Sequence, residues 1–267
     1  MIKCEVRVGN ETVYYQVIGE GEPIILVHGL IGSTLWWNRN ISALAEHYRV
    51  YLVDLPGFGT MSHFYYRFVL DEVASWLLFW MEAAGIKQAN FVGHSMGGYI
   101  CIWLAVHKPE VVRTLVLASP AGVLKTRSLL GYFIPLLQVF RIASPSFLPI
   151  LVYDTIRAGP LTLLSAAQDL LAKDIREKLK LISSPTLLIW GINDVLVPPI
   201  FAKILHEEIA NSNLLILKNA GHVVMYDQWQ EFNKALLAFL GSQDLREDFK
   251  SSELIIHDIK SKTETNR

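Results

Sequence analysis

The 267-residue sequence is poor in cysteine and has no excess of charge of either sign. Its two cysteines, Cys4 and Cys101, are too few for a disulfide framework, and their spacing fits no zinc motif. The formal net charge is −1 and there is no basic stripe, so a nucleic-acid partner is not expected. The first residues, MIKCEVRVGNE, lack the apolar stretch of a secretory signal. We therefore expect a reducing, cytoplasmic environment.

Long hydrophobic runs without a break are also missing, although 52% of the residues are hydrophobic. Residues 128–153, SLLGYFIPLLQVFRIASPSFLPILVY, are numerous enough to cross a bilayer and carry a single charge, Arg141. The run contains three prolines, at positions 135, 145 and 149, which argue against one continuous helix. We predict two or three short helices of a lid rather than a membrane span. A weak contact between this lid and a membrane surface stays open.

Along most of the chain, segments typical of strands alternate with segments typical of helices. Residues 2–8 and 11–19 alternate in polarity around Gly9 and Asn10, which indicates a hairpin. Buried strands are predicted within residues 23–29, 48–59, 88–94, 111–120, 184–191 and 213–219, with helices between them. This order predicts an α/β fold with a mostly parallel sheet of the eight-stranded type, flanked by helices on both faces.

The alternation is interrupted once, which suggests an inserted unit. We expect residues 1–122 and 183–241 to form the α/β core and residues 123–182 to form a helical cap. Residues 242–267 form a charged and polar C-terminal tail outside the alternation, although SSELIIHDI (251–259) could dock onto the core.

The pentapeptide GHSMG at residues 93–97 lies between a predicted strand and a predicted helix. It matches the pattern G-x-S-x-G, in which a serine stands at the apex of a sharp strand-to-helix turn. Such a turn leaves no room for side chains two residues away, and Gly93 and Gly97 meet that need. The first N–H groups of the helix and its dipole point toward the serine oxygen. Ser95 is therefore the candidate nucleophile, with an ordinary helix-capping serine as the alternative.

With this motif, the chain resembles the α/β-hydrolase family over roughly residues 20–240. The resemblance implies a serine, an acid and a histidine in that chain order. GINDVLVP offers Asp194 and NAGHVVM offers His222, each after a predicted strand. Ser95 is then the nucleophile, His222 the base and Asp194 the acid that orients it. Ser119 and Pro120 occupy the family's other acid position, where no carboxylate competes.

The resemblance also implies an oxyanion hole built from the backbone N–H groups of Leu30 and Met96. We expect substrate-binding contacts from Trp37, His94 and Val223. A packing role explains His94 equally well. Helix packing explains at least one of Trp36 and Trp37, and a pocket wall could use the other.

The sequence has no metal-ligand cluster and no phosphate-binding loop, so no cofactor is expected. An apolar lid favours a carboxylic ester with an apolar acyl or aromatic portion, cleaved through an acyl-enzyme. Hydrolysis of a thioester or a carbon–carbon bond by the same fold remains open, and so does a low-turnover ligand receptor or membrane-associated accessory protein. The oligomeric state cannot be inferred from the sequence.

Overall fold

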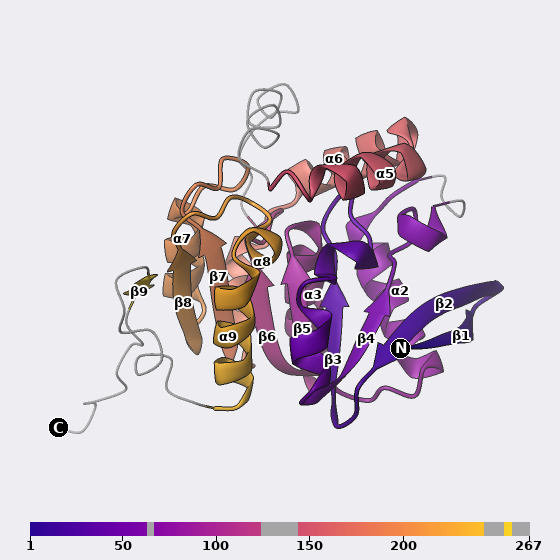
Figure 1. Cartoon of the computed structure of the whole chain (residues 1–267), viewed down its shortest axis with the longest axis horizontal. Coiled ribbons are helices and arrows are strands. Elements are labelled where there is room, and N and C mark those ends of the chain that lie inside the picture. Colours follow the sequence, from indigo (N-terminus) through magenta and orange to yellow (C-terminus); the bar gives the residue numbers. More distant parts are fainter. Residues whose placement is uncertain (63–66, 124–143, 243–253, 258–267) are drawn as a thin grey trace.

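The computed structural model describes residues 1–62, 67–123 and 144–242, together with the backbone of residues 254–257. The chain forms one sheet in the order β1-β2-β4-β3-β5-β6-β7-β8-β9, with helices packed against it (Figure 1). The strands are β1 (Ile2–Val8), β2 (Glu11–Ile18), β3 (Glu22–Val27), β4 (Tyr48–Val53), β5 (Ala89–His94), β6 (Val112–Ala118), β7 (Thr186–Gly191), β8 (Ser212–Leu217) and β9 (Leu254–His257).

The helices occupy the segments between and after the strands. The α-helices are α1 (Ile41–Ala45), α2 (Leu70–Ala83), α3 (Met96–His107), α5 (Leu148–Ala158), α6 (Pro160–Ala172), α7 (Ile200–Glu208), α8 (Val224–Asp227) and α9 (Trp229–Leu240). The short 3₁₀ helices are η1 (Thr34–Trp37), η2 (Gly59–Met61), η3 (Pro109–Val111) and η5 (Arg176–Leu181).

The predicted mostly parallel sheet is confirmed. From β4 to β8 every pair of neighbouring strands is parallel, whereas β1, β2 and β9 join the sheet by antiparallel pairs. Parallel strands end at the same edge of a sheet, so the loops that follow β3, β5, β6, β7 and β8 meet at one edge. The candidate site residues lie in or next to these loops.

The ninth strand departs from the sequence prediction of an eight-stranded sheet. Residues 254–257 of the tail pair with residues 214–217 of β8 and extend the sheet beyond the eight predicted strands. The run LIIH is apolar enough to pair with an exposed sheet edge. These four residues lie within the segment 251–259 that the sequence analysis considered able to dock onto the core.

Two apolar clusters, one on each face of the sheet, hold the fold together. Alternate residues of β3 point to opposite faces, so that Ile25 joins one cluster and Ile24 the other. The first cluster includes residues of α2, α3 and α7, among them Trp80, and the second includes residues of α1 and α9 together with Trp37. Central strands such as β5 are buried on both faces.

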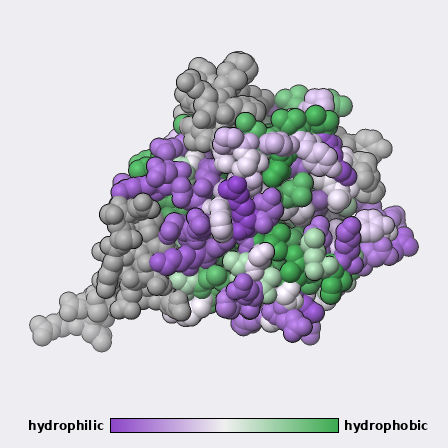
Figure 2. Space-filling view, viewed as in Figure 1, coloured by the Kyte–Doolittle hydropathy of each residue, from purple (hydrophilic) through white to green (hydrophobic). Residues whose placement is uncertain are grey.

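Helices α5 and α6 lie over the edge of the sheet where the parallel strands end (Figure 1). Helix α5 buries Leu151 and Asp154 and exposes Val152 and Ile156. Figure 2 shows hydrophobic residues on the surface at this end of the molecule. Within the described part of the chain, no helix has both the length and the apolar character that a membrane span requires. Residues 128–143 of the predicted lid lie outside the described residues.

Gly97 offers a test of how closely α3 packs on β3. A Cβ atom at Gly97 would lie 2.4 Å from the Val27 carbonyl oxygen, so Gly97→Ala must push the two elements apart. We expect this variant to lower the free energy of unfolding by about 2–3 kcal/mol, measured by urea denaturation.

Gly85→Ala is the matched control, because it also adds one methyl group but meets no atom within 4 Å and carries only the cost of its positive φ. That cost is about 1 kcal/mol. Equal losses in the two variants would contradict the close approach of α3 to β3.

Candidate active site

Ser95 stands at a strained turn between β5 and α3. Its φ of 52° and ψ of −115° are unusual for a residue other than glycine. The Ser95 N–H donates to the Ala118 carbonyl oxygen of the neighbouring strand at 3.0 Å, which holds the turn in place. A Cβ atom at Gly93 would lie 2.5 Å from the Gly97 carbonyl oxygen, so the turn requires glycine there. The turn is thus sterically restricted, as the sequence predicts.

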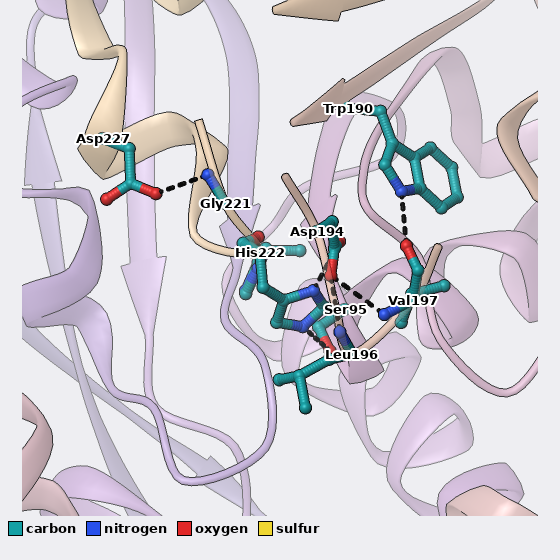
Figure 3. Close-up of polar contacts among 9 residues, drawn as sticks. Ser95, Trp190, Asp194, Leu196, Val197, Gly221, His222 and Asp227 are labelled. Carbon is teal, nitrogen blue, oxygen red and sulfur yellow. Dashed lines mark hydrogen bonds and ion pairs between the residues drawn. The ribbon is translucent and has the colours of Figure 1, made fainter. Parts of the chain in front are cut away.

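Ser95, His222 and Asp194 form a continuous hydrogen-bonded row (Figure 3). His222 Nδ1 lies 2.8 Å from Asp194 Oδ2, and His222 Nε2 lies 2.9 Å from Ser95 Oγ. Asp194 Oδ2 accepts the hydrogen bond from Nδ1–H, so Nε2 is the nitrogen that accepts the hydrogen bond from the Ser95 hydroxyl. Ser95 follows β5, Asp194 lies in the loop after β7 and His222 lies in the loop after β8. All three residues are buried.

Asp194 is itself held by backbone donors. Its Oδ1 accepts from the N–H groups of Leu196 and Val197 at 3.0 and 2.9 Å (Figure 3). Trp190 Nε1–H donates to the Val197 carbonyl oxygen at 2.8 Å and fixes the same loop to β7. The two oxygens of Asp194 therefore have different partners: Oδ2 binds His222, and Oδ1 binds the backbone of its own loop.

The loop that carries His222 is fixed on two sides. Asp227 Oδ2 accepts from the Gly221 N–H at 2.9 Å, and burial raises the pKa of the Asp227 carboxyl (Figure 3). From the other side, His94 Nε2–H donates to the His222 carbonyl oxygen at 2.9 Å. The His94 and His222 rings lie 4.9 Å apart, centroid to centroid.

His94 was expected to contact substrate, but its side chain is fully enclosed by protein. Burial, with His222 close by, lowers its pKa well below the usual value, so the ring is neutral. The described structure thus gives His94 a packing and positioning role beside His222. This is one of the two alternatives that the sequence left open.

The loop after β3 holds Leu30 close to Ser95. Gly32 N–H donates to the Gly29 carbonyl oxygen at 3.0 Å, and Ile31 between them has a φ of 72°, which is strained for a β-branched residue. A Cβ atom at Gly29 would lie 3.0 Å from Ser95 Cβ, so the loop touches the serine. Met96 is the first residue of α3, where an N–H has no acceptor within the helix. Leu30 thus follows the residue that lies against Ser95, and Met96 follows Ser95 in the chain; an oxyanion hole formed by their two amides stays a prediction.

Two buried side chains support this loop from the core. His28 donates from Nδ1 to the Gly29 carbonyl oxygen and accepts from the Leu55 N–H at Nε2, and its burial lowers its pKa. Asp54 accepts from the N–H groups of Thr34 and Thr60, and thereby joins the start of η1 to the segment DLPGFG (residues 54–59). These bonds are consistent with a supporting role for His28 and for that segment.

The tryptophan beside the site is Trp36, not Trp37. Trp37 is fully buried, and its ring lies 6.4 Å from that of Phe232 of α9, centroid to centroid. Adjacent residues of a 3₁₀ helix point in directions about 120° apart, so the Trp36 side chain points away from the direction of Trp37. Its ring lies 5.6 Å from His94 and 4.9 Å from Phe147. The expected pocket role of Trp37 is therefore wrong.

Val223 lies directly after His222, buried at the start of α8 in the same apolar cluster as Trp36. Its contact with a substrate remains a prediction.

Sequence reasoning missed Asp154 of α5, whose carboxylate accepts from Ser33 and Trp36, directly after the loop that carries Leu30. The only signal was a carboxylate within an otherwise apolar stretch, residues 147–156.

Comparison with known proteins places this architecture in a family. A family model of the alpha/beta hydrolase fold matches residues 22–148, and a model described as TAP-like protein matches residues 169–250. A protein of Azorhizobium caulinodans that carries the name of a carbamate hydrolase is 30% identical over 258 residues, covering 88% of this chain and 97% of that protein.

A pimeloyl-[acyl-carrier protein] methyl ester esterase of Vibrio vulnificus is 28% identical, covering 86% of this chain and 98% of the esterase. Among solved structures, a membrane phospholipase A superposes with a TM-score of 0.79 at 26% identity, covering 90% of this chain and 86% of that one.

The Asp194–His222 hydrogen bond can be tested by the reactivity of Ser95. Asp194→Asn is expected to slow labelling of Ser95 by a fluorophosphonate by roughly 10³- to 10⁴-fold, because an amide can favour the wrong imidazole tautomer. The labelling rate is measured by mass spectrometry, and circular dichroism checks the fold. Asp174→Asn, at an exposed carboxylate, is the control. Labelling of Asp194→Asn at the wild-type rate would rule out the orienting role.

Proposed function

Because this chain belongs to the α/β-hydrolase family, we propose that it is a serine hydrolase that cleaves carboxylic esters with an apolar acyl or aromatic portion. One observation carries the proposal, namely the row of two hydrogen bonds from Ser95 Oγ through His222 to Asp194 at a strained turn. A serine hydroxyl is a weak nucleophile at neutral pH, and this arrangement provides the base that activates it. Ser95, His222 and Asp194 are accordingly assigned as nucleophile, base and orienting acid.

In the first half of the proposed reaction, Ser95 Oγ attacks the ester carbonyl carbon while His222 Nε2 takes the hydroxyl proton. The negative charge that develops on the carbonyl oxygen is stabilised by the N–H groups of Leu30 and Met96. His222 then gives its proton to the departing alcohol, and the acyl group remains on Ser95 as an ester.

In the second half, water replaces the alcohol. His222 accepts a proton from the water as it attacks the acyl carbon, and the same two amides stabilise the second oxyanion. Collapse of this intermediate returns the proton to Ser95 Oγ and releases the carboxylic acid. Asp194 keeps its charge throughout and stabilises the transient imidazolium.

The aromatic residues beside His94, which precedes the serine, support an apolar acyl portion. Trp36, Phe147 and Tyr226 form an aromatic row next to His94, with centroid distances of 4.9 Å between the first two rings and 4.7 Å between the last two. An ester of an acyl chain is also the substrate in the name of the Vibrio vulnificus relative. A site of this composition favours substrates that bring apolar surface to it.

The exposed face of the cap supports a weak contact with a membrane surface as part of the same proposal. Val152, Ile156 and Leu161 are at least half exposed on α5 and α6. Such a contact would bring the site close to substrates that dissolve in lipid.

The nucleophile assignment predicts that Ser95→Ala loses turnover of p-nitrophenyl esters by about 10⁴- to 10⁶-fold and keeps its fold. Ser119→Ala is the matched control, because Ser119 stands at the end of the neighbouring strand and its hydroxyl has no partner among the described residues. It should keep activity within about threefold, since an unpaired hydroxyl adds little. More than a tenth of wild-type activity in Ser95→Ala would refute the assignment.

The apolar acyl site predicts a dependence on chain length. Each buried methylene contributes about 0.8 kcal/mol, so kcat/KM should rise by up to roughly fourfold per carbon and then level off. A series of p-nitrophenyl esters from acetate to dodecanoate measures this, with thioester and carbon–carbon substrates of matched length beside it. Equal rates for acetate and octanoate would contradict an apolar acyl site, and faster turnover of another bond type would change the reaction assigned.

A further inference from the structure

Asp154 is a cap residue whose carboxylate reaches the loop beside the candidate site. Its side chain projects from α5 and is 1% exposed. Oδ2 accepts from Ser33 Oγ–H and from Trp36 Nε1–H, each at 2.9 Å. The two donors lie more than 115 residues earlier in the chain and cap or form η1, directly after the loop that carries Leu30.

These two hydrogen bonds connect Asp154 to two parts of the proposed active site, the loop of Leu30 and the loop of His222. Ser33 follows Gly32, so holding Ser33 fixes the end of the loop that presents the Leu30 N–H. Trp36 packs against His94, and His94 donates to the His222 carbonyl oxygen. A single oxygen atom of the cap thus constrains the oxyanion loop and, through two rings, the backbone of His222.

The core also holds this segment, from a different direction. Asp54 accepts from the Thr34 N–H at 2.7 Å, one residue after Ser33. On the cap side, Arg157 Nε–H donates to the Gly59 carbonyl oxygen at 2.6 Å, which fixes α5 against η2 one turn beyond Asp154. The start of η1 therefore lies between a core carboxylate and a cap carboxylate.

Stability does not explain why a carboxylate occupies this position. The second oxygen, Oδ1, is buried and has no hydrogen-bond partner among the described residues. Burial raises the pKa of Asp154 to about 6 despite the two hydrogen bonds and the nearby Arg157, with Asp54 adding to the rise. A buried acceptor whose ionisation costs stability marks a candidate for a functional role.

We propose that Asp154 is a positioning residue, which completes the reactive geometry at Ser95 by holding Ser33 and Trp36 when the cap helix α5 is docked. The inference rests on the proposed serine-hydrolase function and adds the cap to its working parts. Asp154 does not touch the reacting atoms. It acts on the rate through the oxyanion loop and through the Trp36–His94 contact.

The test compares Asp154→Leu with Asp154→Asn. Leucine has a similar volume but no acceptor, whereas asparagine keeps a carbonyl oxygen for Ser33 and Trp36. For p-nitrophenyl acetate, Asp154→Leu should lower kcat by about 10- to 100-fold with KM within about threefold, since the loss falls on the transition state. The fluorophosphonate labelling rate should fall in parallel, and Asp154→Asn should keep kcat within about threefold.

Asp169→Leu is the matched control. Asp169 is also a cap carboxylate that contacts the core, accepting from the Leu70 N–H at 2.8 Å, but it does not reach the loop after β3. Its loss should lower Tm and leave kcat unchanged. Equal losses of kcat in Asp154→Leu and Asp169→Leu would overturn the proposal, because general weakening of the cap would then explain both. A change in KM alone would overturn it as well.

A variant that lacks both donors tests whether Asp154 affects kcat through Ser33 and Trp36. In Ser33→Ala/Trp36→Phe, the donors are gone while an aromatic ring remains against His94. This background should itself lose kcat by about the same factor as Asp154→Leu, and adding Asp154→Leu should change kcat by less than about twofold. A full-sized effect of Asp154→Leu in this background would overturn the proposal. If Asp154→Leu does not fold, the background alone still decides, since wild-type kcat there would also overturn it.

The raised pKa adds a readout that is independent of activity. An acid with a pKa near 6 in the folded protein and a lower one in the unfolded chain costs stability above that range. Asp154→Asn should therefore raise Tm by a few degrees at pH 8, and the difference should shrink as the pH falls through 6. A lower Tm for Asp154→Asn at pH 8 would show that the carboxylate stabilises the fold, and would overturn the argument that stability does not explain this residue.

Ser95→Ala is included in every series to separate the two proposals. If Ser95→Ala keeps its activity, the proposed function fails whatever Asp154 does. If Ser95→Ala is inactive and Asp154→Leu matches the wild type, only the positioning role of Asp154 is lost.

Discussion

The positive φ of Ser95 is the constraint on which the rest of the site depends. A residue in this conformation is held only where its neighbours leave no alternative. Here the N–H of Ser95 is bound to β6, and glycines stand on both sides because Cβ atoms at either one would meet backbone oxygens. The parallel sheet supplies these fixed neighbours, and it brings the loops of Asp194 and His222 to the same edge. The strained turn and the hydrogen-bonded row are thus consequences of one arrangement.

Buried carboxylates organise the loops around this turn. Asp194 binds the N–H groups of its own loop, Asp227 binds the loop of His222, and Asp54 binds the start of η1. Each fixes backbone donors that strands and helices leave unpaired at the sheet edge. Asp154 likewise accepts from donors at η1, but it belongs to α5 of the predicted cap, and we propose that the geometry of the core depends on it. This difference is why the cap enters the proposed mechanism.

Much of the architecture could be predicted because it is encoded locally. A buried parallel strand such as β5 is a short apolar run, and a sharp strand-to-helix turn needs glycines at fixed positions, so the strands and Ser95 can be found from a few residues each. Asp194 and His222 required the family resemblance, since nothing in a short window joins them to Ser95. The sequence allowed residues 251–259 to dock but did not specify a ninth strand, because an edge strand is defined by its partner and the run LIIH has only three apolar residues.

The sequence by itself therefore determined the α/β order of elements, the turn at Ser95 and the candidates for its partners, because periodicity and steric demand act between near neighbours. Tertiary structure alone decided that Trp36 rather than Trp37 faces the site, because the direction of each ring depends on how η1 is seated on the sheet. It also decided that His94 supports His222 from within the core. The contact of Asp154 with Ser33 spans 121 positions in the chain, and such a contact exists only once α5 has packed against the core.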